Sequence, residues 1–391
     1  MLLRRRLSSF IAALLLFIAA SSASAQQPTR PANPEPSPAP STVPREEQEP
    51  VRVFTEEVRL PVLVTDDEGR FDPTLELEDV MVFEDDAMQE VTSLRHVPAN
   101  VLLLLDTGNQ MALAKSTNTT REIALRLVSS LRPGDRLAVV QFNERVETLQ
   151  DWTNDKETVA RILKTKLIAG KRTRLAEALA AASSKLLEMP AGSRHLVLIT
   201  DGVEGPGGKL SYEEAARRLT AAQATLYVIS YTELTRQIVD KRFGSIFLKP
   251  NPNNPPRDMS PGANPDPTMS QVMNRNPSYK LGRISTDFKM RQQARDYAKA
   301  TVQSERRLAA LADETGGRLL LAKSTEEIIR QGAEVAREMG AEYVLTYRPR
   351  RALASAQTGE YRRLKVALRR GGLSVRARRG YVVTTEERKQ K

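Results

Sequence analysis

Two aspartates that follow buried strands are the residues of this sequence whose type and position could do chemistry. Asp106 ends the apolar run Val101–Leu105, and Asp201 follows the run Leu196–Thr200. Continuous apolar runs are typical of strands in a parallel sheet that is covered on both faces. Because the carboxyl ends of such strands meet at one edge, where open α/β folds bind ligands, we expect the two carboxylates to lie together. Paired carboxylates suggest a divalent-cation site.

The segments around these aspartates alternate between strand and helix patterns. The expected strands are 101–106, 136–142, 146–152, 195–200 and 225–231, and the expected helices are 121–131, 158–167, 175–187 and 212–222. The same alternation resumes with a helix at 291–312, followed by a strand at 318–322 and a helix at 325–339. This alternation predicts an α/β fold with a doubly wound, Rossmann-like parallel sheet.

Shorter strand patterns flank this α/β part on both sides. Val58, Leu60, Val62 and Val64 alternate with other residues, and strands are also expected at 80–83, 91–97, 343–348, 361–368 and 373–377. We predict that the flanking strands form one small, sandwich-like β unit.

The amino-terminal segment has the pattern of an export signal. Arg4–Arg6 form a basic region, Phe10–Ala20 an apolar region, and Ala23–Ala25 an A-x-A cleavage site. A Pro-rich linker at 26–50 is expected to be disordered. The sequence therefore predicts a periplasmic or secreted protein that is not an integral membrane protein after signal cleavage. An uncleaved anchor is the alternative.

The predicted domain organisation follows from these patterns. It comprises a signal peptide at 1–25, a linker at 26–50, a β unit beginning at 51–98, an α/β domain at 99–340, and closing strands with a basic tail at 341–391. Within the α/β domain, residues 236–300 break the rhythm and contain a Pro-rich and Asn-rich stretch at 251–267. We expect this segment to be a long insertion.

The layout resembles a von Willebrand factor A domain, and more closely the bacterial von Willebrand A-related proteins first grouped from acidobacterial genomes. The resemblance covers about residues 53–383 and is carried by two pieces. VRLPVLVTDDEGR with LELEDVMVFEDD opens the core, and EYVLTYRPR with YRRLKVALRR and VRARRGYV closes it.

The resemblance implies a metal-ion-dependent adhesion site. Asp106, Thr173 and Asp201 match its two aspartates and its threonine, whereas Gly108 and Gln110 stand where the family has two serines. Without those two hydroxyl ligands, a hard cation loses direct oxygen ligands. We therefore predict a degenerate site and no metal cofactor.

Two interpretations of the site remain open. In one, a divalent cation (Mg²⁺, Mn²⁺ or Ca²⁺) still binds to the retained residues. In the other, the aspartates cap loops or helix starts at the sheet edge, or pair with the basic neighbours of Thr173. The basic neighbours of Thr173 in the sequence are Lys171, Arg172 and Arg174.

Catalytic and nucleic-acid signals are weak in this chain. The sequence has no cysteine and no G-x-S-x-G motif, and its two histidines, His96 and His195, lack metal-site spacing. The net charge is +11, but the basic residues are scattered and no aromatic stripe accompanies them, so no nucleic-acid partner is expected. We predict a non-enzymatic module that binds a protein partner or mediates adhesion at the bacterial envelope. Metal-dependent adhesion is the alternative, and an envelope hydrolase ranks last.

Overall fold

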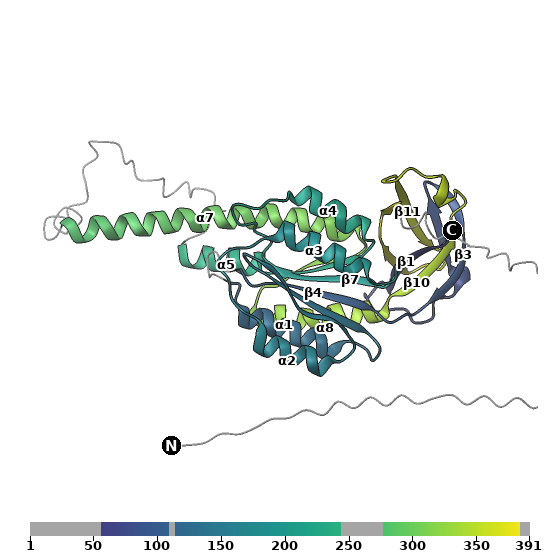
Figure 1. Cartoon of the computed structure of the whole chain (residues 1–391), viewed down its shortest axis with the longest axis horizontal. Coiled ribbons are helices and arrows are strands. Elements are labelled where there is room, and N and C mark those ends of the chain that lie inside the picture. Colours follow the sequence, from purple (N-terminus) through teal and green to yellow (C-terminus); the bar gives the residue numbers. More distant parts are fainter. Residues whose placement is uncertain (1–55, 109–113, 244–276, 384–391) are drawn as a thin grey trace, which may run out of the picture. The chain divides into compact units, whose positions relative to one another are not determined.

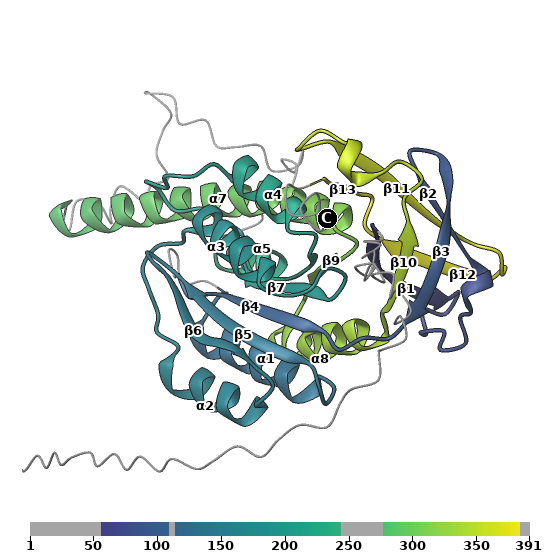
Figure 2. The same ribbon diagram turned by 45° about the vertical axis from the view of Figure 1, so that its right-hand side comes forward.

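The computed structural model describes residues 56–108, 114–243 and 277–383, with the backbone alone for 242–243 and 277–288. Contacts divide the chain into the units Met1–Arg52 and Val53–Lys391. All described residues belong to the second unit, which contains a parallel-strand sheet with helices and a separate antiparallel sheet (Figures 1 and 2). The predicted signal peptide and linker lie outside the described residues.

The parallel-strand sheet has six strands in the order β6-β5-β4-β7-β8-β9. Its strands are β4 (Asn100–Asp106), β5 (Arg136–Phe142), β6 (Val146–Thr153), β7 (Arg194–Thr200), β8 (Thr225–Ser230) and β9 (Arg318–Leu321). All neighbouring strands are parallel except the β5–β6 pair. The sequence prediction of a doubly wound α/β fold is confirmed.

Helices cover both faces of this sheet. Every residue of β4 is therefore buried, and its side chains alternate between two cores. Leu103 and Leu105 pack in one core, and Leu102 and Leu104 in the other. The first core includes residues of α1 (Thr117–Ser130), α2 (Lys156–Lys166) and α8 (Thr325–Ala341), and the second includes residues of α3 (Leu175–Leu187), α4 (Tyr212–Ala221) and α7 (Pro277–Glu314). Figure 2 shows the two helix layers.

Short polar side chains begin several of these helices. Ser116, Ser211 and Ser324 each accept a hydrogen bond from the backbone N–H three residues ahead, and Asp155 does so at α2. These caps satisfy amide groups that the helix itself leaves without a partner.

The segment predicted as an insertion at 236–300 begins and ends in helices. α5 (Thr232–Phe243) continues past residue 236, and α7 is a single helix of 38 residues that begins well before the expected 291. Residues 244–276, which include the whole Pro-rich and Asn-rich stretch at 251–267, lie outside the described residues. No helix in the described part of the chain is long and apolar enough to cross a membrane.

The flanking strands form a seven-stranded sheet in the order β12-β1-β10-β3-β2-β11-β13, all antiparallel. Its strands are β1 (Val58–Asp66), β2 (Val80–Glu84), β3 (Ala87–Arg95), β10 (Tyr343–Arg348), β11 (Tyr361–Leu368), β12 (Leu373–Ala377) and β13 (Gly380–Val382). Strands from both ends of the α/β part therefore share one sheet, as predicted. The alternating apolar residues of β1 lie in its core with Leu345 and Tyr347.

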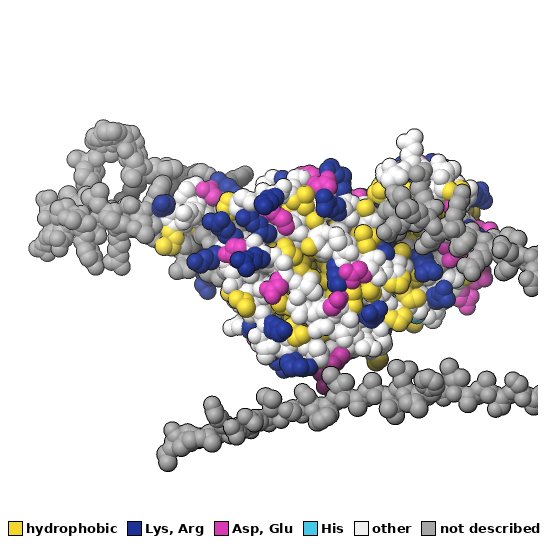
Figure 3. Space-filling view, viewed as in Figure 1, with side chains coloured by type: hydrophobic (Ala, Val, Ile, Leu, Met, Phe, Trp, Pro, Cys, Tyr) yellow, Lys and Arg dark blue, Asp and Glu magenta, His cyan; other side chains and the backbone are white. Residues whose placement is uncertain are grey.

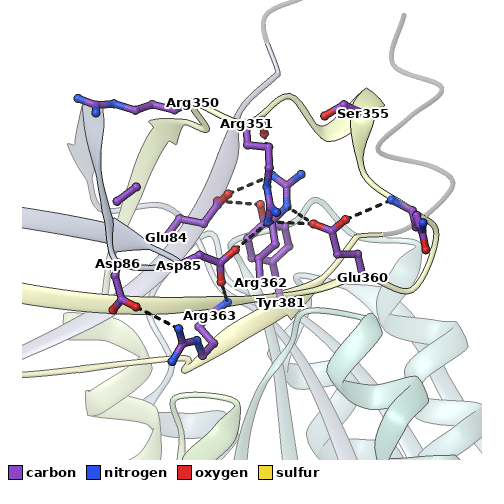
Figure 4. A network of polar contacts seen from close by, with 12 residues as sticks. Glu84, Asp85, Asp86, Arg350, Arg351, Ser355, Glu360, Arg362, Arg363 and Tyr381 are labelled. Atoms are coloured by element: carbon purple, nitrogen blue, oxygen red, sulfur yellow. Dashed lines mark hydrogen bonds and ion pairs between the residues drawn. The ribbon is translucent and has the colours of Figure 1, made fainter.

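A buried ion pair lies inside the β unit (Figure 4). The Arg362 side chain is fully buried and donates to Glu84 Oε1 at 3.0 Å. The hydroxyls of Tyr347 and Tyr381 donate to Glu84 Oε2 at 2.7 and 2.9 Å. Every oxygen of this buried carboxylate is therefore hydrogen-bonded, as buried charges require.

Glu342 and His195 form a second buried pair, and we expect their titrations to have opposite effects on how stability depends on pH. Burial raises the pKa of Glu342 to about 7 and lowers the pKa of His195 to about 4, and 3.7 Å separates Glu342 Oε2 from His195 Nδ1. Between pH 4.5 and 6.5 the folded protein keeps a proton on Glu342 and none on His195, whereas the unfolded chain does the reverse. In the wild type, the changes with pH that these two groups make to the free energy of unfolding therefore have opposite signs and offset each other.

Single substitutions are expected to separate these contributions. In His195→Gln only Glu342 remains, so the free energy of unfolding falls as pH rises from 4.5 to 7, by roughly 1 kcal/mol per pH unit. In Glu342→Gln only His195 remains, so it falls as pH drops from 6.5 to 4. Urea unfolding of both variants across this range measures the slopes, and slopes of the same sign would contradict the assignment.

Candidate functional site

The structure brings Asp106 and Asp201 together at the carboxyl edge of the parallel sheet. Asp106 ends β4, Asp201 directly follows β7, and these two strands are paired neighbours. The residues are 0% and 1% exposed. The third sequence-predicted residue, Thr173, is also buried, and its hydroxyl donates to Asp106 Oδ1 at 3.2 Å.

A lysine that the sequence analysis did not identify lies between the two carboxylates. The ammonium nitrogen of Lys115 is 2.8 Å from Asp106 Oδ2 and 3.2 Å from Asp201 Oδ1, and its side chain is 5% exposed. The same nitrogen is 3.5 Å from the hydroxyl oxygen of Thr173. Lys115 Nζ thus contacts all three residues that the family resemblance assigns to metal binding.

Lys115 comes from the loop that leads into α1 and directly precedes its N-cap, Ser116. The cap fixes the start of the helix, and the long lysine side chain reaches back to the sheet edge. One signal could have identified it, since two buried carboxylates need a compensating cation and a nearby loop lysine can supply one.

Hydrogen bonds hold the carboxylates in place around the lysine. Asp106 accepts from the backbone N–H of Gly108 at 3.0 Å and from the hydroxyl of Thr200 at 2.6 Å. Asp201 accepts from the backbone N–H of Val203 at 3.2 Å and from the hydroxyl of Tyr297 at 2.5 Å. Tyr297 belongs to α7, so that helix contributes to the site.

The charges at the site are strongly coupled. Burial raises the pKa of Asp106, and the neighbouring Lys115 opposes this shift. Burial alone would lower the pKa of Lys115, but the carboxylates of Asp106 and Asp201 outweigh it and the net shift is upward. Burial and the charge of Asp201 raise the pKa of Tyr297. The lysine is therefore held as an ammonium ion, and the tyrosine is held as a hydrogen-bond donor.

This set of residues fits a divalent cation poorly. An ion between the carboxylates would meet the ammonium group of Lys115, and Mg²⁺ requires near-octahedral oxygen ligands at about 2.0–2.1 Å. Among the described residues, no group of three or more His, Cys, Asp and Glu side chains could hold a metal ion.

Packing around Gly108 excludes the missing serine. A Cβ atom there would come within 2.2 Å of the backbone oxygen of Arg172 and within 2.4 Å of Thr173 Oγ1. Gly108 also pairs with Gly170 in an isolated parallel bridge. A hydroxyl-bearing side chain at position 108 would therefore require the 170–173 segment to move. Gln110, the other substituted position, lies outside the described residues.

The basic residues beside Thr173 do not provide the counter-charge in the described structure. The side chains of Lys171 and Arg172 are exposed, and the Arg174 guanidinium donates to the backbone oxygen of Pro206. The prediction of pairing with the basic neighbours of Thr173 is therefore wrong in its residues, because the carboxylates pair with Lys115.

Helix α7 covers one side of the site through further contacts. The hydroxyl of Ser304 donates to the backbone oxygen of Gly202 at 2.6 Å. Glu305 accepts from the hydroxyl of Thr232 at 2.8 Å and pairs with Arg236 at 2.6 Å, both near the start of α5. Tyr297 of the same helix donates its hydroxyl to Asp201 Oδ2, so α7 takes up one oxygen of that carboxylate.

Comparison with known proteins identifies the α/β part. Residues 100–259 match the family model of the von Willebrand factor type A domain. No curated protein matches the chain. The resemblance to the acidobacterial-type subgroup stays a prediction, since all the pieces that carry it lie outside the matched residues 100–259.

Several solved structures are similar to part of the chain. An aerotolerance-related membrane protein from Bacteroides fragilis is 21% identical over 33% of this chain and 66% of that one, with a TM-score of 0.29. BatB from Bacteroides thetaiotaomicron is 23% identical over 33% of this chain and 65% of that one, with a TM-score of 0.29. The von Willebrand domain of the type V pilus tip protein Mfa5 from Porphyromonas gingivalis is 22% identical over 28% of this chain and 39% of that one, with a TM-score of 0.25. The chain thus spans less than two thirds of the length of these chains.

Proposed function

We propose that this chain, whose residues 100–259 match the family model of the von Willebrand factor type A domain, is an exported, non-enzymatic module that binds a protein partner without a metal ion. The match to this domain family supports a role in protein interaction or adhesion. The observation that carries the metal-independent part is the ion triad of Lys115, Asp106 and Asp201. A tethered ammonium group there supplies the positive charge that a bound cation would otherwise supply.

The partner surface proposed here is the loop edge around Thr173. Lys171 and Arg172 are exposed on this edge. The chain carries a net charge of +11, and in Figure 3 Lys and Arg side chains lie over the helices of the α/β part among fewer Asp and Glu side chains. An acidic protein surface at the bacterial envelope is the partner that fits this charge, and such association weakens as salt is added.

The predicted export signal places the module in the periplasm or outside the cell. The Pro-rich stretch at 26–50 would then act as an extended spacer. Mass spectrometry of the amino terminus of the protein recovered from the envelope or medium tests this, with Gln26 as the expected first residue.

Affinity capture from an envelope extract tests the proposed interaction. The chain from residue 26 onward is immobilised, and capture is compared in EDTA and in Mg²⁺. We expect the same partner in both, with capture reduced about tenfold by the double substitution Lys171→Glu and Arg172→Glu. The matched control is Arg330→Glu, an exposed arginine on α8.

Two outcomes would overturn the proposal. A partner that is captured only with Mg²⁺ would support metal-dependent adhesion instead. Capture that the loop substitutions and the control reduce equally would show that the loop edge is not the contact surface.

A further inference from the structure

A cavity of about 410 Å³ lies at the opposite edge of the parallel sheet, against the β unit. Its lining combines the amino ends of β4 and β5 and the loop before β7 with residues of β1, β3 and β10. Three arginines, Arg59, Arg95 and Arg136, line it. None of the other described residues in its lining is Asp or Glu.

Strand register places Arg59 and Arg95 on one face of the β sheet. Arg59 is opposite Thr346 in the β1–β10 pair, and Arg95 is opposite Val344 in the β10–β3 pair. Directly opposed residues share a face, and so do residues two apart on a strand. Their neighbour Leu345 lies in the core on the other face. The two arginines therefore belong to the face that borders the cavity.

The third arginine comes from the other sheet. Arg136 is the first residue of β5 and is opposite Asn100 of β4. Asn100 also lines the cavity, and its side-chain amide donates to the hydroxyl of Ser193 at 2.7 Å. Positive charges from two sheets thus meet around one hollow.

In the described part of the chain, the three arginines of the cavity lack the acidic partners that Arg362 and Arg363 of the β unit have. Arg363 pairs with Asp86 at 3.0 Å, and Arg362 pairs with Glu84 at 3.0 Å. Among the described residues, no hydrogen bond or ion pair is made by the side chains of Arg59, Arg95 or Arg136. Lys185 and, more weakly, Arg136 lower the pKa of Asp151, but Asp151 is paired with Lys185 at 2.6 Å.

We propose that this cavity binds a small organic anion through an oxyanion group, either a carboxylate or a phosphate. Guanidinium groups recognise both through paired N–H donors. Val97, Pro98 and Val344 supply an apolar wall for the carbon skeleton of such a ligand. The volume lies at the lower end of the range for small-molecule sites, which often form between domains.

Calorimetric titration of the full chain tests the proposal, with inorganic phosphate, glucose 6-phosphate, citrate and glucuronate as probes at constant ionic strength. The wild type is expected to bind either the two phosphates (inorganic phosphate and glucose 6-phosphate) or the two carboxylates (citrate and glucuronate). Which of the two groups binds identifies the oxyanion. Arg59→Gln and Arg136→Gln are each expected to weaken binding about tenfold, as is typical for the loss of one charged hydrogen-bonding group. Arg145→Gln is the control, since Arg145 is exposed and lies at the other end of β5.

The variants distinguish a site from general attraction to a basic protein. Binding that all three variants weaken equally, or that none of them weakens, would overturn the proposal, as would the absence of binding by the wild type. Because Arg59, Arg136 and the control residue Arg145 are all exposed, the three variants are expected to fold, and circular dichroism checks this. The partner capture described above uses the other sheet edge, so its failure would leave this test unaffected.

Discussion

Replacing Lys115 by methionine is expected to lower the free energy of unfolding by about 3–5 kcal/mol. The substitution nearly preserves side-chain volume but removes the ammonium group that contacts Asp106 and Asp201. It leaves two buried carboxyl groups without their counter-charge, and the cost of an uncompensated buried charge exceeds the net value of the pair. Urea unfolding monitored by circular dichroism measures the change.

Two further variants separate this effect from a simple packing defect. Adding Asp106→Asn and Asp201→Asn to Lys115→Met removes the uncompensated charges and is expected to recover more than half of the lost stability. Arg217→Met is the surface control, since the Arg217 side chain is 73% exposed beside Glu214 and its loss is expected to cost under about 1 kcal/mol. A Lys115→Met variant that unfolds within about 1 kcal/mol of the wild type would contradict the ion triad.

Arg362→Met is expected to destabilise the β unit by a similar amount, about 3–5 kcal/mol. The fully buried guanidinium of Arg362 is the cation that pairs with Glu84. Two tyrosine hydroxyls donate the remaining hydrogen bonds to the Glu84 carboxylate. Without that cation, Glu84 must be buried as an unpaired charge or take up a proton. Thermal and urea unfolding both measure the loss.

The neighbouring arginine provides a matched control for this network. Arg363 is next in the chain, but its side chain is 70% exposed where it pairs with Asp86, so Arg363→Met is expected to cost under about 1 kcal/mol. Combining Arg362→Met with Glu84→Gln is expected to recover part of the stability, because the amide carries no charge. Equal losses in Arg362→Met and Arg363→Met would show that burial of the pair is unimportant.

The sequence predicted the sheet edge well, because continuous apolar strands fix where their terminal residues lie. Asp106 and Asp201 follow such strands, and parallel pairing of β4 with β7 brings them together. Thr173 could be assigned only through the family resemblance, since no local pattern distinguishes it from other loop threonines. Both routes led to residues that the structure places in one cluster.

Lys115 and Tyr297 could not be predicted from local patterns. A lysine directly before a helix N-cap is typically exposed, and only the three-dimensional path of the loop brings its ammonium group to the carboxylates. Tyr297 lies 96 residues from Asp201 in the chain, within a segment predicted as an insertion. Contacts of this kind depend on tertiary packing, which hydrophobic periodicity does not encode.

The extent of α7 was also missed for a physical reason. Its first turns carry Leu281, Ile284 and Phe288 at helical spacing, but they closely follow the Pro-rich and Asn-rich stretch at 251–267, which led to the prediction of one long insertion at 236–300. The β unit was easier, since the period-2 alternation of β1 marks a sheet with one covered face.

Calorimetric titration of the wild-type chain with Mg²⁺, Mn²⁺ and Ca²⁺ tests the central claim most directly, with Asp106→Ala titrated in parallel. If the ammonium group of Lys115 takes the place of a cation, none of the three ions gives a saturable heat, and the two proteins give the same traces. Saturable binding of one ion per chain by the wild type, lost in Asp106→Ala, would contradict the account.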